Sequence, residues 1–287
     1  MSGQGRRVLV TGASGLIGRH AVAALAAQGF TVLPVRQAST DLLDPAARIA
    51  LVKTARADTL LHLAWETEHG AFWHSPRNEA WLGASIDLVD RFLDQGGQRV
   101  VVAGTCAEYD WNALPDRVPE NHRIAPFTAY GLAKNYLYEY IYNLNTSFAW
   151  GRVFLLYGAG EDPRRLVPSV AGALVRGEPA LCSSGIQIRD FMDTRDVGAA
   201  FAALVASASQ GAINVGTGIG HPVAEVAAVL GGLAGRPDLI RLGALPDRPS
   251  EPPRLVADTT RLQLQVGFHP KISLTQGLAD AFAAIPR

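Results

Sequence analysis

The sequence predicts an α/β protein in which a doubly wound parallel sheet is followed by a smaller C-terminal α/β lobe. Three observations support this class. Short apolar runs alternate with helical patterns in the first half of the chain, the first of these units turns through closely spaced glycines, and the second half is less regular. Alternating strands and helices favour a parallel sheet with helices on both faces. The 287 residues suffice for one or two domains with a large core.

The first unit, residues 7–36, is the clearest. The apolar run Val8–Val10 predicts a strand, a helical pattern follows to Gln28, and Thr31–Val35 predicts a second strand. Glycines between the first strand and the helix let a pyrophosphate approach the backbone at the helix N-terminus, as in a Rossmann-type dinucleotide site. The alternative is a glycine-rich turn that binds no ligand. We expect cofactor contacts from Gly12, Ser14, Gly15, Leu16, Ile17 and Gly18.

The residue after the second strand indicates which dinucleotide binds. An NAD site usually has Asp or Glu there, to hold the ribose 2′-hydroxyl, whereas this chain has Arg36. A guanidinium attracts the 2′-phosphate of NADP, and Arg19, directly after the last glycine, adds a second charge. The sequence therefore favours NADP(H). NAD(H) stays an alternative, because Arg36 could simply be a surface residue.

Further strand and helix units follow along the chain. Asp44-Pro45 predicts a helix start, because Asp caps helices and Pro fits their first turn. The proline-rich stretch 243–253 is expected to be a loop. Strands are expected at 59–63, 99–103 and 148–154, and helices at 44–54, 78–95, 128–144, 167–176, 223–234, 258–266 and 274–284.

Composition excludes several classes. With 48% hydrophobic and 18% charged residues the chain is typical of a soluble globular protein, and its zero net charge gives no case for nucleic acid or an anionic membrane as partner. No apolar run is long enough to span a bilayer. The start, residues 6–10, resembles a signal peptide, but Thr11 and Gly12 interrupt the apolar run. Cys106 and Cys182 form no disulfide framework, so a cytoplasmic location is expected.

Three residues are candidates for acid–base chemistry. Tyr130 and Lys134 are four positions apart on a predicted helix and share one face. A nearby ammonium favours the phenolate, so the tyrosine can exchange a proton with a carbinol oxygen while hydride moves at the carbon. Thr105, at the end of its strand, can hold the same oxygen. The alternative is an ordinary solvated helix face.

These motifs together resemble the extended short-chain dehydrogenase/reductases, which include nucleotide-sugar epimerases, dehydratases and keto-reductases. The resemblance rests on Thr11–Gly18, on Thr105 and on the run Tyr130-Gly131-Leu132-Ala133-Lys134, and it extends over nearly the whole chain. Further matching stretches are 41–44, 62–64, 152–154, 157–158, 188–191, 196–197, 214–218 and 248–251.

The resemblance implies a division of labour along the chain. The dinucleotide domain would comprise residues 1–156 plus about 186–216, and the nucleotide-sugar lobe 157–185 plus 217–287. Asp41 and Leu42 would lie on the adenine side of the cofactor, and Leu63 and Ala64 under the nicotinamide ribose. In the substrate half, Arg189 and Arg248 would bind the sugar diphosphate, for which a guanidinium fork is suited. Surface charge or internal ion pairs are the alternative for these arginines. Trp65 and Asn78 are also expected at the substrate.

The chain departs from the family pattern at several places. Sugar dehydratases of this family carry Asp and Glu just after the catalytic threonine, where this chain has Cys106 and Ala107, so dehydration is excluded. An Asn-Val-x-Gly-Thr pattern is replaced by Trp81-Leu82-Gly83-Ala84-Ser85, and an expected asparagine by Leu155. Cys106 has no visible activating group and is interpreted as a small buried residue.

The loop from Trp65 to His74 is unusually rich in aromatic, histidine and glutamate residues. Its spacing fits no metal-ligand motif, so no metal is expected. The favoured interpretation is an aromatic lid over the sugar, and ordinary loop packing is the alternative.

The sequence therefore favours a cytoplasmic, NADPH-dependent reductase that acts on a keto group, at C4 by preference, of a nucleotide-activated deoxysugar. A nucleotide-sugar 4-epimerase that retains NAD is the first alternative, because it would use the same residues. A non-catalytic NADP-binding sensor is the second. By resemblance, a homodimer is expected to form through the helices at 78–95 and 128–144.

Overall fold

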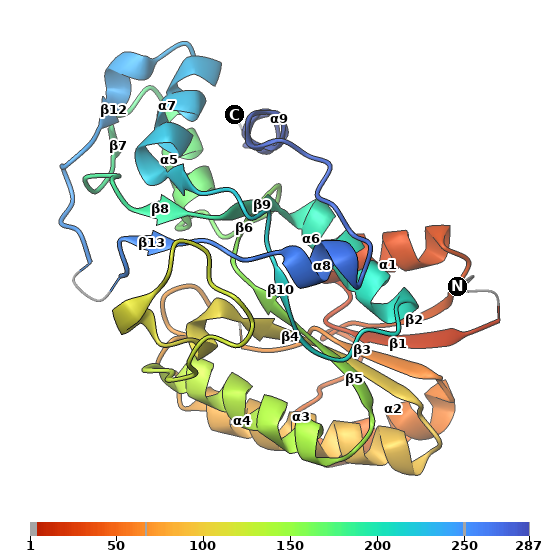
Figure 1. Cartoon of the computed structure of the whole chain (residues 1–287). Coiled ribbons are helices and arrows are strands. Elements are labelled where there is room, and N and C mark those ends of the chain that lie inside the picture. Colours follow the sequence, from red (N-terminus) through yellow and green to blue (C-terminus); the bar gives the residue numbers. More distant parts are fainter. Residues whose placement is uncertain (1–4, 67, 249–250, 287) are drawn as a thin grey trace.

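The computed structural model describes residues 5–66, 68–248 and 251–286. Its centre is a six-stranded sheet in which every neighbouring pair is parallel, with the strand order β10-β5-β4-β3-β1-β2 (Figure 1). The strands are β1 (Arg7–Thr11), β2 (Thr31–Val35), β3 (Thr59–His62), β4 (Arg99–Thr105), β5 (Ser147–Val153) and β10 (Gly211–Val215).

The strand order has a reversal beside β1. The chain moves from β1 to β2 on one side and then to β3 on the other. In open α/β sheets, ligands bind outside the carboxyl ends of the strands at such a reversal. The fold therefore directs the search for a site to the ends of β1, β3 and β4.

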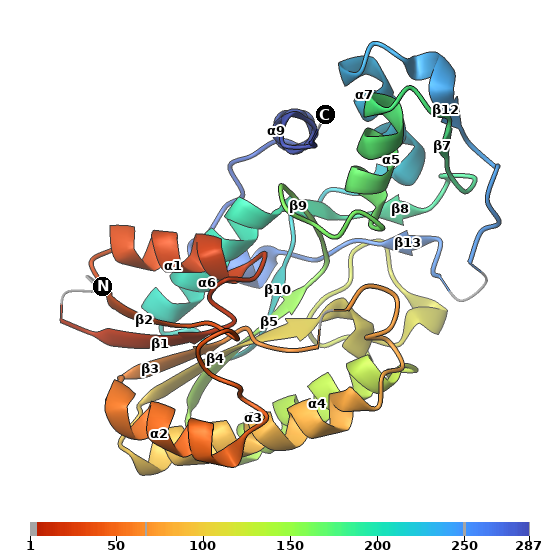
Figure 2. The ribbon, with the colours of Figure 1, turned by 180° about the vertical axis from the view of Figure 1, so that it is seen from behind.

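Helices cover both faces of this sheet. Helices α1 (Gly18–Ala27) and α6 (Thr194–Ala206) lie on one face, and α2 (Pro45–Ala55), α3 (Arg77–Asp94) and α4 (Ala129–Asn143) lie on the other (Figures 1 and 2). Residues of β1 alternate between the two cores: Val8 and Val10 pack towards α1 and α6, and Leu9 packs towards the opposite layer. This alternation follows from the period of two in a strand.

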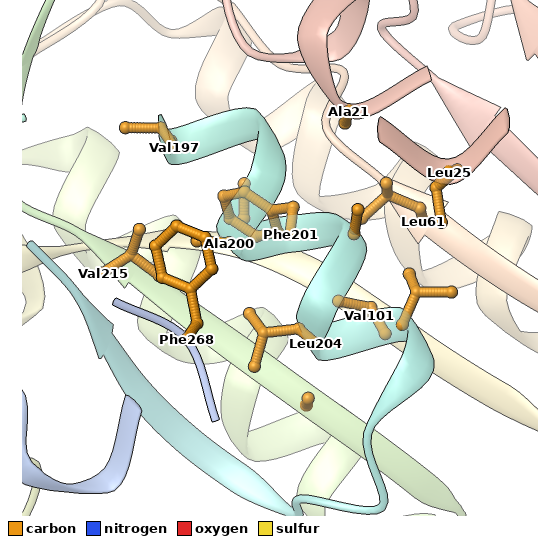
Figure 3. Packing of buried hydrophobic residues seen from close by; sticks show 14 of the residues in the cluster. Ala21, Leu25, Leu61, Val101, Val197, Ala200, Phe201, Leu204, Val215 and Phe268 are labelled. Atoms are coloured by element: carbon orange, nitrogen blue, oxygen red, sulfur yellow. The ribbon is translucent and has the colours of Figure 1, made fainter. Parts of the chain in front are cut away.

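Helix α6 contributes much of the first core. Figure 3 shows Val197, Phe201 and Leu204 of this helix among side chains from the strands and from α1. Nine of the 13 residues of α6 are buried and none is exposed, so its sequence lacks the polar stripe of a surface helix. The sequence did not predict this helix, for that reason.

A smaller lobe lies beyond the carboxyl ends of the strands (Figures 1 and 2). Helices α5 (Leu166–Val175), α7 (Val223–Leu233) and α9 (Leu274–Ala283) share a separate apolar core. Its short strands form small sheets: β6 (Leu155–Tyr157) with β9 (Phe191–Asp193), β7 (Ala180–Leu181) with β12 (Ile240–Arg241), and β8 (Ile188–Arg189) between β11 (His221–Pro222) and β13 (Arg254–Leu255). The residue boundaries expected for the two domains stay predictions.

Most predicted elements are present within one or two residues of the expected bounds. Asp44 caps α2 by accepting a hydrogen bond from the Ala46 N–H at 2.9 Å, and Pro45 occupies the first turn. Near the C-terminus, the helix expected at 258–266 is shorter than predicted: α8 (Thr260–Leu264) is about one turn long. Within the residues described, no helix combines the length and the apolar character that crossing a membrane requires.

Candidate active site

The glycine turn after β1 is shaped by close backbone contacts. Gly12 has a φ of +67°, and a Cβ there would lie 2.8 Å from the Ala64 nitrogen. A Cβ on Gly18 would collide with the Gly12 carbonyl. Gly15 is different, because its Cβ would meet only the Gly12 oxygen, at 3.3 Å. Two glycines thus permit packing, while the third leaves room on the side where a pyrophosphate would approach.

Thr11 ties the turn to the end of β3. Its hydroxyl accepts the N–H groups of Leu63 and Ala64 at 3.2 and 3.4 Å and contacts His62 Nδ1 at 2.7 Å. The other ring nitrogen of His62 lies 2.9 Å from the Ser85 hydroxyl. Burial lowers the pKa of His62 to about 3, with Lys134 adding to the shift, so this histidine is neutral. These contacts fix Leu63 and Ala64 beside the glycine turn, where a cofactor role was expected.

The two expected arginines of the NADP site have different surroundings. Arg36 is exposed directly after β2, and in the described part of the chain its side chain makes no ion pair or hydrogen bond. The Arg19 guanidinium instead donates to the Ala159 carbonyl and to His20 Nε2. Its contribution to a 2′-phosphate site stays a prediction.

The expected adenine-side residues have local structural partners. Asp41 accepts the Leu43 N–H at 2.9 Å. Leu42 is buried, and its carbonyl accepts a hydrogen bond from Arg48 at 2.6 Å. The turn after β2 is therefore firmly held, and the contacts of Asp41 and Leu42 with a cofactor stay predictions.

The structure brings together the three candidate catalytic residues. Thr128 caps α4 by accepting the Gly131 N–H at 3.0 Å, which sets Tyr130 and Lys134 one turn apart on the side facing the end of β4. The Lys134 ammonium donates to the Ala103 carbonyl at 2.8 Å. The same ammonium lies 5.9 Å from the centre of the Tyr130 ring, and Thr105 is near enough to Tyr130 to affect the pKa of its phenol.

Burial dominates the acid–base properties of this group. It raises the pKa of Tyr130 well above its usual value of 10.0, although the hydrogen bond with Thr105 opposes the shift. It lowers the pKa of Lys134, which is 2% exposed, from 10.5 to about 7, opposed by the negative charge of Glu108. Both shifts follow from removing a charged form from water. In the protein without cofactor, Tyr130 is therefore a protonated phenol.

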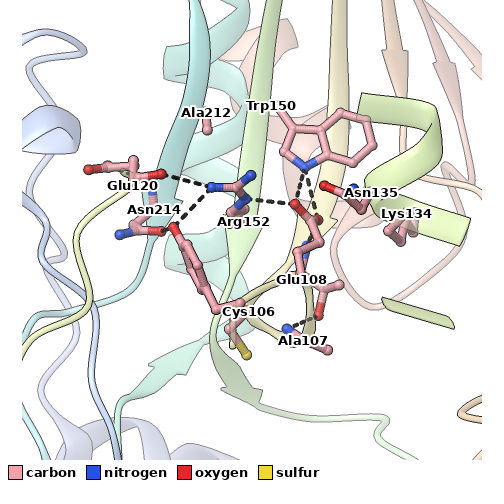
Figure 4. Close-up of polar contacts among 12 residues, drawn as sticks. Cys106, Ala107, Glu108, Glu120, Lys134, Asn135, Trp150, Arg152, Ala212 and Asn214 are labelled. Carbon is pink, nitrogen blue, oxygen red and sulfur yellow. Dashed lines mark hydrogen bonds and ion pairs between the residues drawn. The ribbon is translucent and has the colours of Figure 1, made fainter. Parts of the chain in front are cut away.

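Thr105 is held by a buried glutamate that the sequence analysis missed. The Thr105 N–H donates to Glu108 Oε1 at 2.8 Å, and the Thr105 hydroxyl accepts the Ala107 N–H at 3.2 Å. Glu108 is fully buried and also accepts hydrogen bonds from Trp150 at 3.0 Å and from Arg152 at 2.6 Å (Figure 4). The Thr-x-x-Glu spacing of a capping box was the available signal.

This network extends across the carboxyl ends of three strands. Arg152, on β5, also donates to the Tyr109 hydroxyl at 3.2 Å and to the Glu120 carbonyl at 3.0 Å (Figure 4). Tyr109 in turn donates to Asn214, on β10, at 2.7 Å. The buried charges are thus paired and hydrogen-bonded, as burial demands. The network therefore fixes the position of Thr105 at the end of β4.

The loop after β3 surrounds Tyr130 with aromatic rings. The ring centres of Trp65, Phe72 and Trp73 lie 6.5, 5.0 and 5.8 Å from that of Tyr130, all in edge-on orientations. Its backbone is tied to α4 as well, because the Tyr130 N–H donates to the Trp73 carbonyl at 3.1 Å. Whether this loop covers a sugar stays a prediction.

Asn78 was expected at the substrate, and this role stays a prediction, although the structure gives its side chain partners within the chain. The side chain is 2% exposed; its oxygen accepts the Trp65 indole N–H at 2.9 Å, and its amide donates to the carbonyls of Phe72 and Ser75 at 2.7 and 2.9 Å. Asn78 therefore holds the aromatic loop in place. No group of three or more His, Cys, Asp or Glu residues suited to a metal ion is present among the described residues.

The two arginines expected at a sugar diphosphate share one acid. Arg189 contacts Glu251 at 3.0 Å, and Arg248 contacts the same carboxylate at 3.2 Å. Arg189 is buried, whereas Arg248 is exposed. The ion pairs considered as an alternative are present, and a substrate role for the arginines stays a prediction.

Cys106 follows Thr105 directly, and its thiol is buried. Burial raises the pKa of its thiol from 9.0 to about 12, while the nearby Arg189 opposes the shift. The prediction of an inert buried residue is consistent with this shift.

This geometry can bind a dinucleotide at the glycine turn and exchange a proton at Tyr130. A sequence model described as "NAD dependent epimerase/dehydratase family" matches residues 8–216. The match contains the glycine turn, the Thr105–Tyr130–Lys134 group and the buried network.

Individual relatives cover nearly the full length of the chain. A UDP-glucose 4-epimerase of Cyamopsis tetragonoloba is 24% identical, with 96% of this chain and 93% of the relative aligned. A dTDP-4-dehydro-6-deoxy-D-allose reductase of Streptomyces bikiniensis is 29% identical, with 96% and 95% aligned. Among solved structures, a UDP-glucose 4-epimerase of Thermotoga maritima has a TM-score of 0.89 at 22% identity, covering 97% of this chain and 98% of its own. The similarity to the Thermotoga maritima structure concerns the fold alone.

Proposed function

This chain belongs to the NAD dependent epimerase/dehydratase family, and we propose that it is an NADPH-dependent reductase of a keto group, at C4, of a nucleotide-activated deoxysugar. Membership of the extended short-chain dehydrogenase/reductase type makes it an NAD(P)-dependent enzyme that modifies nucleotide sugars. The finer choices of reduction, of NADP(H) and of a deoxysugar are the proposal.

The observation that carries the choice of cofactor is Arg36. It is exposed at the carboxyl end of β2, without a partner among the described residues, at the position where an NAD site usually has an acid. A guanidinium without a partner suits a phosphate, because it offers a planar fork of donors. NADPH is a net source of reducing equivalents, so this cofactor favours a reductase over an epimerase.

The fit of a dinucleotide rests on the glycine turn. Gly12 and Gly18 allow the turn to pack, and Gly15 leaves space beside the start of α1, where helix N–H groups attract phosphate. A bound nicotinamide supplies or accepts hydride. The residues of this chain then supply the proton, the orientation of the carbonyl and the electrostatic environment.

Tyr130 is suited to deliver a proton to the carbonyl oxygen. Its raised pKa keeps the phenol protonated, which is the state that a reductase needs at the start of each turnover. The Thr105 hydroxyl, adjacent to that phenol, donates to the same oxygen and stabilises the charge that develops on it. After proton transfer, the Lys134 ammonium favours the phenolate that remains.

The substrate half supports a nucleotide sugar. Arg189 and Arg248 meet at Glu251 in the smaller lobe, and a diphosphate would provide oxygens for both guanidinium groups. Elimination of water is excluded, because Cys106 and Ala107 stand where a dehydratase of this family needs an acid and a base. The proposed substrate is therefore a nucleotide sugar that already carries its keto group when it reaches this protein.

One specific observation favours a second candidate, a nucleotide-sugar 4-epimerase with retained NAD. The chain is similar to UDP-glucose 4-epimerases over nearly its full length, and epimerisation would use the same Thr105, Tyr130 and Lys134. A non-catalytic sensor is disfavoured, because all three residues are present and lie at the carboxyl end of β4.

The discriminating experiment begins with the nucleotide carried by the purified protein. Denaturation of one sample should release little nucleotide, or exchangeable NADP(H). A native sample of the same protein should oxidise NADPH when it is given dTDP-4-keto-6-deoxyglucose. Near-stoichiometric NAD, together with interconversion of UDP-glucose and UDP-galactose, would overturn the reductase in favour of the epimerase.

A further inference from the structure

The Lys134 ammonium lies over the face of the Trp65 indole. Its Nζ is 3.8 Å from the centre of that ring and 5.9 Å from the centre of the Tyr130 ring. Trp65 is 8% exposed and Lys134 is 2% exposed, so water has little access to the contact. A cation over an aromatic face is attracted by the electrons of the ring, most strongly over tryptophan and where water is excluded. Trp65 is therefore in a position to stabilise the charged form of this lysine.

Few other groups in the described chain stabilise that charge. Lys134 donates to the Ala103 carbonyl at 2.8 Å, and it forms no ion pair with an acid among the described residues. The titratable groups that face it in the same part of the chain are His62, Glu108 and Tyr130. The histidine and the tyrosine are uncharged at neutral pH. The Glu108 carboxylate favours the ammonium but is already paired with Arg152 at 2.6 Å.

Asn78 fixes the orientation of the Trp65 ring. Its side-chain oxygen accepts the indole N–H at 2.9 Å, and its amide donates to the carbonyls of Phe72 and Ser75 at 2.7 and 2.9 Å. Both ends of the amide are thus used, which leaves it one orientation. The Trp81 ring also stacks on that of Trp65, with 6.3 Å between the centres. The indole cannot turn its face away from the lysine without breaking these contacts.

Burial makes the charge of Lys134 sensitive to such a contact. Removal from water lowers the pKa of Lys134 to about 7, opposed by the negative charge of Glu108. At neutral pH the residue is therefore divided between ammonium and amine, and a contact that favours the ammonium changes the charged fraction. An aliphatic side chain in place of Trp65 would fill the space without attracting a cation.

We propose that Trp65, oriented by Asn78, is a positioning residue that keeps Lys134 in its ammonium form beside Tyr130. The inference rests on the proposed function for its consequence in catalysis, because the ammonium stabilises the phenolate that remains after Tyr130 has given its proton. The role differs from the one expected for Trp65 at the substrate, since the contact with the lysine is present without any ligand.

The test is a pH titration of the lysine side chains in the cofactor-free protein. The sequence has three lysines, Lys53, Lys134 and Lys271, so labelling with ¹³C at the lysine Cε gives three signals. The Lys134 signal, identified by its loss in K134M, should have methylene protons shifted upfield by the indole ring. In W65L it should titrate about one pH unit lower than in the wild-type protein. In W65F it should titrate between the two, because a phenyl ring attracts a cation less strongly than an indole. The signals of Lys53 and Lys271, which are exposed, should not differ between the variants.

5-Fluorotryptophan separates the electrostatic contact from simple packing. Fluorine withdraws electrons from the indole with little change in its size, so Lys134 should titrate lower in the fluorinated wild-type protein as well. Fluorination of W65F should cause no further change, although its remaining tryptophans carry fluorine. W111F is the control for loss of an indole that donates elsewhere, to the Cys106 carbonyl, and should leave the Lys134 titration unchanged. If W65L does not fold, the fluorinated proteins decide the question.

The pH profile of turnover provides the second readout. With NADPH and a keto-sugar nucleotide, the alkaline limb of kcat should lie about one pH unit lower in W65L, while kcat on the acidic side stays near the wild-type value. A variant that merely loosened the site would lose kcat at every pH. A higher KM for the nucleotide sugar, with the limb unmoved, would assign Trp65 to the substrate and overturn the role proposed here.

The outcomes separate this inference from the proposed function. An unchanged Lys134 titration in W65L and in the fluorinated wild-type protein would overturn the role of Trp65 and leave the reductase standing. A lowered titration, in a protein that oxidises NADPH with no keto-sugar nucleotide, would support the contact of Trp65 with Lys134 and count against the reductase.

Discussion

The Lys134 ammonium lies 3.8 Å from the centre of the Trp65 ring. This contact joins the helix that carries Tyr130 to the loop that surrounds it. A buried ammonium with few acceptors gains from an aromatic face, which attracts cations. Trp65, expected at the substrate, thus contacts a candidate catalytic residue, and any contact with a sugar stays a prediction.

Replacing Tyr130 by Phe should abolish turnover and spare cofactor binding. The phenol is the proposed proton donor, and removing a positioned general acid reduces kcat by about 10²–10⁴-fold. Steady-state kinetics and NADPH titration measure the two effects. Y142F is a suitable control, since Tyr142 is exposed on the same helix. A fully active Y130F protein would refute the mechanism.

Charge reversal at Arg36 should alter the choice of dinucleotide. R36E places a carboxylate beside the 2′-phosphate, so affinity for NADPH should fall by about 10–100-fold, the range for losing a hydrogen bond to a charged group. NADH should bind at least as well as before. The ratio of the two dissociation constants is the measurement. Tighter binding of NADH than of NADPH by the wild-type protein would sink the preference for NADP(H).

Lys134 should make the stability of the cofactor-free protein depend on pH. Its pKa falls from 10.5 to about 7 on folding, so between these values the unfolded chain binds more protons than the folded one. Stability from this residue should therefore rise as pH increases from about 7 towards 10.5. The difference in unfolding free energy between wild-type and K134M proteins, measured against pH, isolates this contribution. A difference that stays flat from pH 7 to 10 would contradict the depressed pKa.

Glu108 should matter for stability as well as for the position of Thr105. E108Q leaves Arg152 as a buried charge without its counter-ion, a change that costs about 3–5 kcal/mol. Urea unfolding gives the loss, and the double variant E108Q/R152M should recover part of it, because it removes the uncompensated charge. A loss below about 1 kcal/mol would mean that the network holds Thr105 without this ion pair.

Arg189 should affect the nucleotide sugar and not the dinucleotide. R189M is expected to raise the KM for a nucleotide sugar strongly and to leave the Kd of NADPH unchanged, since the residue lies in the smaller lobe. R236M is the control, because Arg236 is exposed and forms an ion pair with Asp238. An unchanged KM in R189M would remove this residue from the substrate site.

Local patterns predicted much of the fold. The glycine turn, the Asp44 cap and the alternating apolar runs specify elements through contacts within a few residues, so they are visible in sequence. Helix α6 was missed because it is buried on almost every side and shows no polar stripe. Its identity as a helix depends on the sheet that it covers.

In the candidate site, too, residues specified by local patterns could be predicted and residues specified by tertiary contacts could not. Tyr130, Lys134 and Thr105 could be found because helix spacing and strand ends are local properties. The surroundings of Asn78 could not be predicted, because its three hydrogen bonds go to a loop whose path is not encoded locally. Glu108 was not predicted to take part, because its buried partners are brought near it only by folding.

The sequence by itself determined the class of fold, the glycine turn and the three candidate catalytic residues, because each depends on spacing along one or two elements. Only the tertiary structure decided how charged and polar groups are paired: Glu108 with Arg152, Asn78 with the aromatic loop, and Lys134 with Trp65. The physical reason is desolvation. A buried polar group must find its partner in whatever part of the chain the fold brings near, and that choice is made across distances that no local pattern records.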